Sequence, residues 1–309
     1  MIRRTLLTLS RSKQLEHLVG SAPISRSVVH RFVAGETTAE AVTVTRTLIE
    51  SGRSVTIDNL GEDVVDLEHA NLTRDRYLDL LTRLYENQLT HGTEVSVKLS
   101  AVGQALPGDG EKIALENAHA ICQAAHAVST TVTLDMEDHT TTDSTLSIVR
   151  ELRRDFPQTG AVVQAYLHRT EEDCRELAFE GSRVRLCKGA YKEPATVAFQ
   201  SKADVDRSYV RCLKVLMAGQ GYPMVASHDP RLIDIAGALA IRYDRPKGTY
   251  EYQMLYGVRP HEQERLAAEG ETMRVYLPYG DDWYGYMVRR MAEKPANLTL
   301  FLKSLTSKN

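Results

Sequence analysis

The chain has 309 residues, of which 42% are hydrophobic and 26% are charged. That length suffices for a large core and falls within the size range of a single α/β barrel. The formal net charge of -3 provides no basic field for binding nucleic acid. The four cysteines lack CxxC spacing, which argues against a zinc site or a disulfide framework and favours reduced thiols in the cytoplasm.

The first part of the chain has a helical pattern. From residue 3 to about residue 51, apolar residues recur at steps of three and four without a strand-like run. The basic start, MIRRTLLTLSRSKQLEHLVG, lacks the uninterrupted apolar stretch and small-residue cleavage site of a signal peptide. No run reaches the roughly 18 apolar residues of a membrane span. We therefore expect residues 1–52 to form a helical segment packed on the main domain.

Eight short runs rich in Val, Ile, Thr and Tyr follow, with helical patterns between them. The strand-like runs cover 54–60, 94–100, 131–137, 161–167, 183–189, 222–228, 250–256 and 273–279. The helical patterns cover 74–88, 111–128, 143–156, 170–181, 204–221 and 230–243. Buried strands that alternate with helices pair in parallel through βαβ crossovers.

Eight such units predict a (β/α)8 barrel of the TIM type, an α/β fold, over residues 53–309. The N-terminal segment would cover it, and a final helix would lie over its mouth. The alternative is a doubly wound open sheet, but no strand is followed by the GxGxxG turn typical of that fold.

Polar residues gather where the predicted strands end. They are Asp58, Glu62, Lys98, Asp135, Glu137, Asp138, Gln164, Arg185, Lys188, Ser227, His228, Glu251, Gln253 and Tyr276. Seven of the eight runs carry at least one ionisable side chain, and such groups are costly to bury singly. Because the active sites of these barrels lie at the carboxyl ends of the strands, the pattern predicts one polar site.

Arg289 and Arg290 stand side by side after an aromatic turn, in the stretch WYGYMVRRMAEKPAN. Neighbouring helical residues point about 100° apart, so the pair does not form an ordinary ladder of ion pairs. Two guanidinium groups converging on one anion would explain the pair. A solvated basic turn would explain it equally well.

Several stretches, taken in order, resemble the proline dehydrogenase family of flavin-dependent barrel enzymes. They are SVKLS, LDMED, VVQAYLHRT, RVRLCKGAYKE, ASHD, YEYQMLYGVR and RVYLPYGDDWYGYMVRRMAEKPAN, with VTIDNLGE as a weaker match. The resemblance is closest to the compact single-function bacterial form. It implies oxidation of L-proline to Δ1-pyrroline-5-carboxylate, the first step of proline catabolism. Hydride would pass from C5 of proline to N5 of FAD.

The resemblance also implies partners and a location. Electrons would pass to a quinone, so we expect a cytoplasmic protein, with peripheral contact to the inner face of the membrane as an option. The basic N-terminal helix and the C-terminal residues 301–309 are the candidate contacts, since basic amphipathic segments favour anionic lipid.

Matching the family's site to this sequence assigns expected roles. The catalytic residues are Asp135 and Arg185. The substrate-binding residues are Lys98, Arg289, Arg290, Tyr276, Leu255 and Tyr191. The cofactor-binding residues are Met136, Gln164, Arg185, Lys188, Gly189, Ala190, Ser227 and His228. In this assignment Asp135 is an isolated aspartate among three cations. Glu293 is within helical reach of both paired arginines, so it would either hold one of them in place or form an ion pair on the helix surface.

Glu137 and Asp138 are left out of the site as a solvated acidic turn, and no metal is expected. Three rival functions are also to be considered. Another flavin-dependent barrel would act on a folate or an amine, and it would not need three cations around one carboxylate. A metal-dependent hydrolase or aldolase would need histidines at ligand spacing, which the sequence lacks. A non-catalytic scaffold would gain nothing from so many charges in one mouth.

Overall fold

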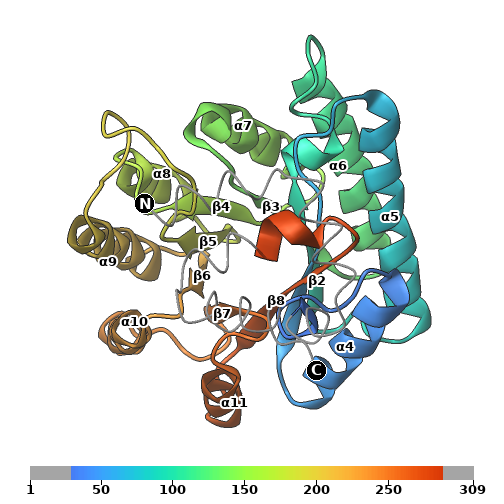
Figure 1. Cartoon of the computed structure of the whole chain (residues 1–309). Coiled ribbons are helices and arrows are strands. Elements are labelled where there is room, and N and C mark those ends of the chain that lie inside the picture. The colour runs from blue at the N-terminus through green and yellow to red at the C-terminus, as the bar shows by residue number, and fades with distance from the viewer. Residues whose placement is uncertain (1–28, 288–309) are drawn as a thin grey trace, which may run out of the picture.

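The structure is a computed structural model, and it describes residues 29–287. Eight parallel strands form one sheet (Figure 1). They are β1 (Ser54–Asn59), β2 (Thr93–Lys98), β3 (Thr131–Asp135), β4 (Ala161–Gln164), β5 (Arg183–Cys187), β6 (Tyr222–Ala226), β7 (Glu251–Leu255) and β8 (Met273–Tyr279). All eight expected strands are therefore present, and most end one to three residues earlier than the sequence pattern suggested.

The sheet runs in the order β3-β2-β1-β8-β7-β6-β5-β4, so β1 pairs with both β2 and β8. The remaining gap, between β3 and β4, is bridged next to Gly160. Leu134 N donates to Gly160 O at 3.0 Å, and Gly160 N donates to Val132 O at 2.8 Å. A Cβ atom at Gly160 would overlap the Thr133 side chain, so glycine permits this close approach. The sheet thus closes into the predicted TIM-type barrel, and the open-sheet alternative is wrong.

Helices surround the barrel, and all of those described except α4, which precedes β1, connect successive strands (Figure 1). They are α4 (Thr38–Glu50), α5 (Leu67–Glu86), α6 (Gly110–Ala127), α7 (Thr142–Leu152), α8 (Thr170–Leu177), α9 (Lys202–Ala218), α10 (Pro230–Arg242) and α11 (Pro260–Ala268). Two short 3-10 turns, η1 (Leu99–Val102) and η2 (His139–Thr141), follow β2 and β3. Helix α11 is additional to the helical segments named from the sequence.

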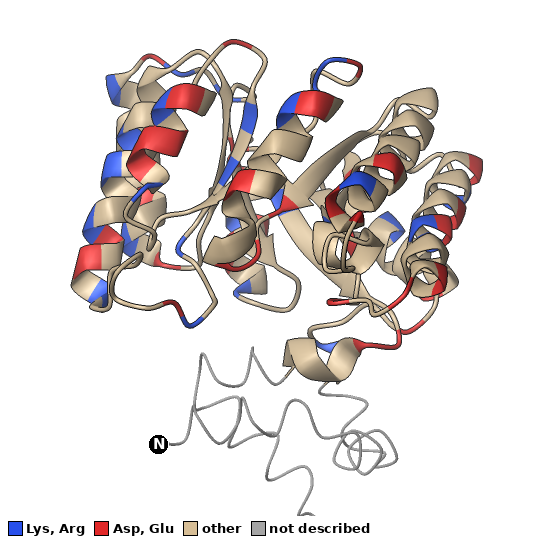
Figure 2. Cartoon of the chain, turned by 90° about the horizontal axis from the view of Figure 1, so that it is seen from above, with Lys and Arg blue, Asp and Glu red and all other residues tan. Residues whose placement is uncertain are grey.

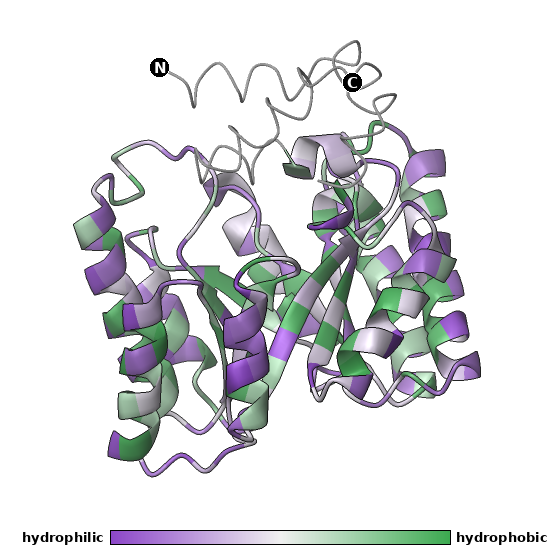
Figure 3. Ribbon diagram, turned by 60° about the horizontal axis from the view of Figure 1, so that its bottom comes forward, coloured by the Kyte–Doolittle hydropathy of each residue, from purple (hydrophilic) through white to green (hydrophobic). Residues whose placement is uncertain are grey.

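Helix α5 illustrates how local sequence builds this outer layer. Its buried residues, among them Ala70, Tyr77 and Leu84, recur at helical spacing and face the barrel. Asp66 caps its start by accepting a hydrogen bond from His69 N at 2.8 Å, which satisfies an otherwise unpaired backbone donor. The inward faces of the helices and the strands are mainly hydrophobic, while purple hydrophilic segments lie on the outer surface (Figure 3).

Residues 29–36 lie beside the start of the last helix. Ala34 N donates to Pro278 O at 2.9 Å, and Trp283 Nε1 donates to Glu36 Oε1 at 3.2 Å. Trp283 and Met287 pack with Phe32 in a small hydrophobic cluster separate from the main core. The helix over the mouth begins within the described residues, but Arg289, Arg290 and Glu293 lie outside them. The boundary at residues 52 and 53 stays a prediction.

Two properties of the described residues bear on possible partners: the distribution of charge and the character of the helices. Lys, Arg, Asp and Glu alternate along the outer helices, without a face of one sign in this view (Figure 2). Within the described residues, no helix combines the length and the apolar character needed to cross a membrane.

Candidate active site

A cavity of about 480 Å³ opens at the carboxyl ends of the strands. Every strand contributes at least one residue to its lining. All thirteen site residues expected from the sequence that fall within residues 29–287 line it: Lys98, Asp135, Met136, Gln164, Arg185, Lys188, Gly189, Ala190, Tyr191, Ser227, His228, Leu255 and Tyr276. Their roles remain predictions, but the fold brings them to one place.

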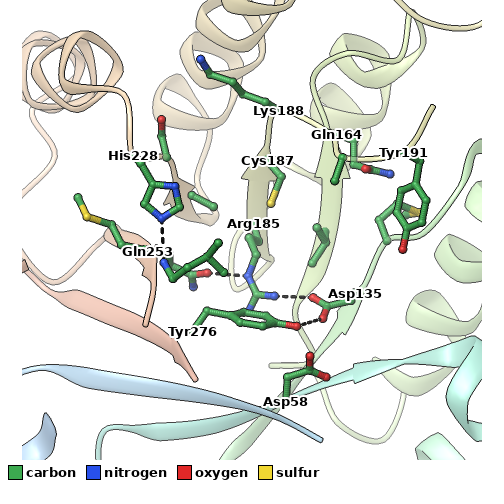
Figure 4. Close-up of a pocket in the computed structure, with 18 of the residues that line it drawn as sticks. Asp58, Asp135, Gln164, Arg185, Cys187, Lys188, Tyr191, His228, Gln253 and Tyr276 are labelled. Atoms are coloured by element: carbon green, nitrogen blue, oxygen red, sulfur yellow. Dashed lines mark hydrogen bonds and ion pairs between the residues drawn. The ribbon is translucent and has the colours of Figure 1, made fainter. Parts of the chain in front are cut away.

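Arg185 lies at the centre of the cavity floor and is almost fully buried (Figure 4). Its Nη1 donates to Asp135 Oδ1 at 2.6 Å, and its Nε donates to Gln253 Oε1 at 2.6 Å. A longer contact of 3.3 Å joins Nη2 to Glu94 Oε1. Because three sides of the planar guanidinium group are bound, its charge is fixed in position.

Asp135 is more fully bonded than the sequence analysis expected. Besides Arg185, its partners are Tyr276, whose Oη donates to Asp135 Oδ2 at 2.7 Å, and Ser96, whose Oγ donates to Asp135 Oδ1 at 3.0 Å. Lys98 Nζ is 3.9 Å away. Asp135 is therefore not isolated, since hydroxyl groups supply two of its short contacts. Whether Arg289 and Arg290 also surround it stays a prediction, because both lie outside the described residues.

Lys98 has a close partner that the sequence analysis did not assign. Its Nζ donates to Asp58 Oδ2 at 2.6 Å. Asp58 is 1% exposed, and burial raises its pKa although Lys98 opposes the rise. Burial lowers the pKa of Lys98, but Asp58 and Asp135 more than compensate and hold it above its ordinary value. Lys98 is therefore charged at neutral pH.

The charges of the barrel interior form a connected network that extends below the cavity. Glu94 Oε2 accepts from Arg183 Nη2 at 2.5 Å, and Glu251 Oε1 accepts from Arg274 Nε at 2.8 Å. Burial raises the pKa of Glu94, but the neighbouring arginines outweigh it and hold that pKa well below its usual range.

The network contains equal numbers of cations and anions. The cations are Lys98, Arg183, Arg185 and Arg274, and the anions are Asp58, Glu94, Asp135 and Glu251. Four positive and four negative charges sum to zero. Within residues 29–287 this network has no surplus positive charge for an anionic ligand. The expected surplus depends on Arg289 and Arg290, which lie outside the described residues.

The loop after β5 brings backbone close to the cavity. Gly189 has φ +109°, and a Cβ atom there would overlap the Tyr166 ring, so only glycine fits without strain. The loop is held by Tyr166 N, which donates to Lys188 O at 2.9 Å. Lys188 Nζ binds Asp206 at 2.5 Å and Asp229 at 3.2 Å. Two carboxylates therefore fix the lysine of this loop.

His228 is held in one tautomer. Leu255 N donates to His228 Nε2 at 2.9 Å, so the proton of the neutral ring is on Nδ1. Arg259 Nη1 donates to His228 O at 3.0 Å, which fixes the backbone at the same point. Ser227 Oγ accepts from Asp229 N at 3.1 Å. The Ser-His-Asp triplet is thus a set of local backbone contacts and does not form a catalytic relay.

Glu137 differs from expectation. The sequence predicts a solvated acidic turn at this position, but Glu137 is 8% exposed and binds Ser100 through both carboxylate oxygens. Burial raises its pKa to about 7. Asp138 caps η2 instead, accepting from Thr140 N at 2.8 Å. The two acidic neighbours therefore have different environments.

Other residues of the cavity were missed or left without a role. Cys187, Met254 and Val162 add apolar surface, and Asp58 and Gln253 add polar contacts. Strand alternation would have found Cys187, because Arg183, Arg185 and Cys187 are at alternate positions of β5. Residues 29–287 contain no group of three or more His, Cys, Asp and Glu side chains placed to hold a metal ion.

Comparison with known proteins identifies the family. A family model described as proline dehydrogenase matches residues 41–301. The chain is 39% identical to proline dehydrogenase 1 of Bacillus subtilis over 308 residues, which cover 100% of both chains. The chain belongs to the proline dehydrogenase family. It is also 38% identical to proline dehydrogenase of Deinococcus radiodurans, over 99% of this chain and 98% of that protein.

Solved structures agree with this family. Proline utilization A from Bdellovibrio bacteriovorus, inactivated by N-propargylglycine, matches with a TM-score of 0.80 and 27% identity. The match covers 87% of this chain and 33% of that one, so the barrel resembles one part of a longer protein. Membership of the proline dehydrogenase family supports proline oxidation as the reaction class.

Proposed function

We propose that the protein oxidises L-proline to Δ1-pyrroline-5-carboxylate with FAD as its cofactor, as the first step of proline catabolism. The observation that carries this proposal is the family match, which spans residues 41–301 and includes every strand of the cavity. The chemistry that FAD supplies when bound is acceptance of the C5 hydride at N5 and delivery of the electrons to a quinone.

The cavity wall on the side of β4 to β6 has the features that a flavin nucleotide needs. Gly189 lets backbone approach a ligand closely, and backbone N–H groups in such loops bind phosphate well. His228, with its proton on Nδ1, and the Ser227 hydroxyl offer polar groups. Met136 and Gln164 line the same cavity. These residues fit the group, and we assign them to hold it.

Other residues that line the cavity suit a small amino acid. Lys98 offers a charged ammonium group, and Tyr276, Leu255 and Tyr191 offer aromatic and apolar surface. A ligand with one carboxylate, one amine and a hydrocarbon ring matches this combination. We assign the substrate carboxylate to Lys98 together with Arg289 and Arg290.

Arg185 and Asp135 act on the reacting centre by charge and placement. The Arg185 guanidinium is a fixed positive charge that would stabilise negative charge developing on the bound flavin, and Asp135 fixes both Arg185 and Tyr276. Burial holds the pKa of Tyr276 well above its ordinary value, so its hydroxyl stays protonated and takes no proton from the substrate. We assign the amine proton to solvent, which takes it before hydride leaves.

Anaerobic mixing with L-proline tests the proposal. The purified protein should carry a yellow flavin, and saturating L-proline should bleach it in the absence of oxygen, whereas D-proline should not. A quinone carried in lipid vesicles should then restore the colour. Delivery to a membrane quinone entails contact with a bilayer, for which the basic N-terminal segment and residues 301–309 remain candidates. A flavin that stays oxidised under saturating L-proline would contradict the proposal.

A further inference from the structure

Glu137 is a buried carboxylate beside the cavity for which the proposed reaction gives no role. It lies two residues after the end of β3, and both of its oxygens accept hydrogen bonds from Ser100 in η1. Ser100 N donates to Oε1 at 3.1 Å, and Ser100 Oγ donates to Oε2 at 2.6 Å. Ser100 is two residues beyond Lys98, so Glu137 holds the turn that follows the cavity lysine.

Ser100 passes this constraint to a second loop. Asp63 N donates to Ser100 Oγ at 3.2 Å, and Val64 N donates to Ser100 O at 3.3 Å. These residues belong to the loop between β1 and α5, whose Glu62 lines the cavity. The position of that loop therefore depends on Ser100, and the position of Ser100 depends on Glu137.

The backbone of Glu137 is fixed from the other side. Gln164 Nε2, at the end of β4, donates to Glu137 O at 2.6 Å. Both Gln164 and Met136, the residue before Glu137, line the cavity. Glu137 thus joins the segments that follow β1 and β2 to the ends of β3 and β4.

We propose that Glu137 is a positioning residue, whose ionised carboxylate, by binding Ser100, holds Lys98 and the loop bearing Glu62 in the arrangement that accepts the substrate carboxylate. The identity of that substrate rests on the proposed function. In the ionised form both oxygens accept charge-assisted hydrogen bonds from Ser100, which are stronger than the hydrogen bonds of a neutral carboxyl group. Protonation turns one oxygen into a donor and weakens the hold on Ser100.

The environment of Glu137 places its titration in an accessible range. Burial raises its pKa to about 7, while the Ser100 hydrogen bonds and the charge of Lys98 from β2 oppose the rise and Glu62 adds to it. Gln164 and Ser100 face it as uncharged groups. Since the folded-state pKa is raised, the folded protein loses stability as pH rises from the ordinary glutamate value through about 7. The form that positions the site is therefore the form that costs stability.

A binding measurement with a proline analogue tests this inference. Cyclopentanecarboxylate has the ring and carboxylate of proline but no amine, so neither amine titration nor turnover complicates its binding. Its Kd for the FAD-loaded protein is followed through the flavin absorbance between about pH 6 and pH 9. Because only about a tenth of Glu137 is ionised one pH unit below its pKa, the wild-type Kd should rise about tenfold at the acid end.

Glu137→Gln should abolish this dependence and bind at every pH at least as weakly as the wild type does at the acid end. It should also raise the thermal unfolding midpoint at alkaline pH, because the buried charge is gone. Ser100→Ala, which removes one of the two hydrogen bonds, should weaken binding in the same direction. Asp138→Asn is the matched control, because Asp138 is the neighbouring carboxylate and its side chain is hydrogen-bonded to Thr140 of η2 and not to Ser100. It should behave as wild type.

The outcomes separate this inference from the proposed function. If Glu137→Gln binds cyclopentanecarboxylate with wild-type affinity and wild-type pH dependence, the positioning role is wrong while the proposed function stands. If the wild-type protein fails to bind the analogue at any pH and L-proline does not bleach its flavin, the proposed function fails and this inference fails with it.

Discussion

Replacing Arg185 with methionine is expected to slow flavin bleaching by L-proline about 10²–10³-fold, the usual cost of removing a preorganised group at a developing charge. The barrel should still fold, because each carboxylate that Arg185 contacts keeps other partners. Glu94 retains Arg183, and Asp135 retains Tyr276. The rate is measured in single turnovers at saturating L-proline without oxygen.

Arg185→Lys separates charge from shape. Lysine keeps the positive charge but cannot bind Asp135 and Gln253 at once in the planar arrangement that Arg185 adopts. We expect it to recover part of the lost rate. An Arg185→Met protein that bleaches within about threefold of the wild-type rate would show that this charge does not act on the reaction.

Replacing Lys98 with methionine should have two separate effects. It leaves Asp58, which is 1% exposed, without its 2.6 Å partner. Removing one member of a buried ion pair typically lowers the free energy of unfolding by about 3–5 kcal/mol. It also removes a cation from the cavity, so L-proline should bind more weakly. Chemical denaturation measures the first effect, and anaerobic titration of the flavin measures the second.

The double variant Lys98→Met with Asp58→Asn distinguishes these effects. A neutral side chain at residue 58 removes the unpaired buried charge, so most of the lost stability should return. The affinity for L-proline should not return, because the cation is still missing. Recovery of wild-type affinity in the double variant would show that Lys98 serves only the fold.

The barrel could be predicted from sequence because the information for it is local. Each strand is a short run of β-branched and apolar residues between amphipathic helices, and eight repeats of that pattern have few other ways to bury both faces. The positions at which the strands end were predicted less accurately. VVQAYL continues the strand pattern to residue 167, but β4 ends at Gln164 because the chain turns there into the loop that holds Tyr166.

The residues of the site could be found because parallel strands bring their carboxyl ends to one edge. The contacts that these residues make with one another could not be predicted. Lys98 and Asp58 are 40 residues apart, and their contact depends on strand register and tilt. The burial of Glu137 could not be predicted either, because the LDMED stretch has the pattern of an acidic turn whether Glu137 faces solvent or Ser100. The neutrality of the interior network follows only when all its partners are known.

Because that network is neutral within residues 29–287, the grip on the substrate carboxylate depends most on Arg289 and Arg290. Anaerobic titration of flavin absorbance with L-proline, in wild type and in Arg289→Met and Arg290→Met, tests this most directly. Each substitution should raise the Kd at least about tenfold, since hydrogen bonds to charged groups contribute about 1.5–3 kcal/mol, while the flavin stays bound. An unchanged Kd, or loss of the flavin instead, would contradict the account.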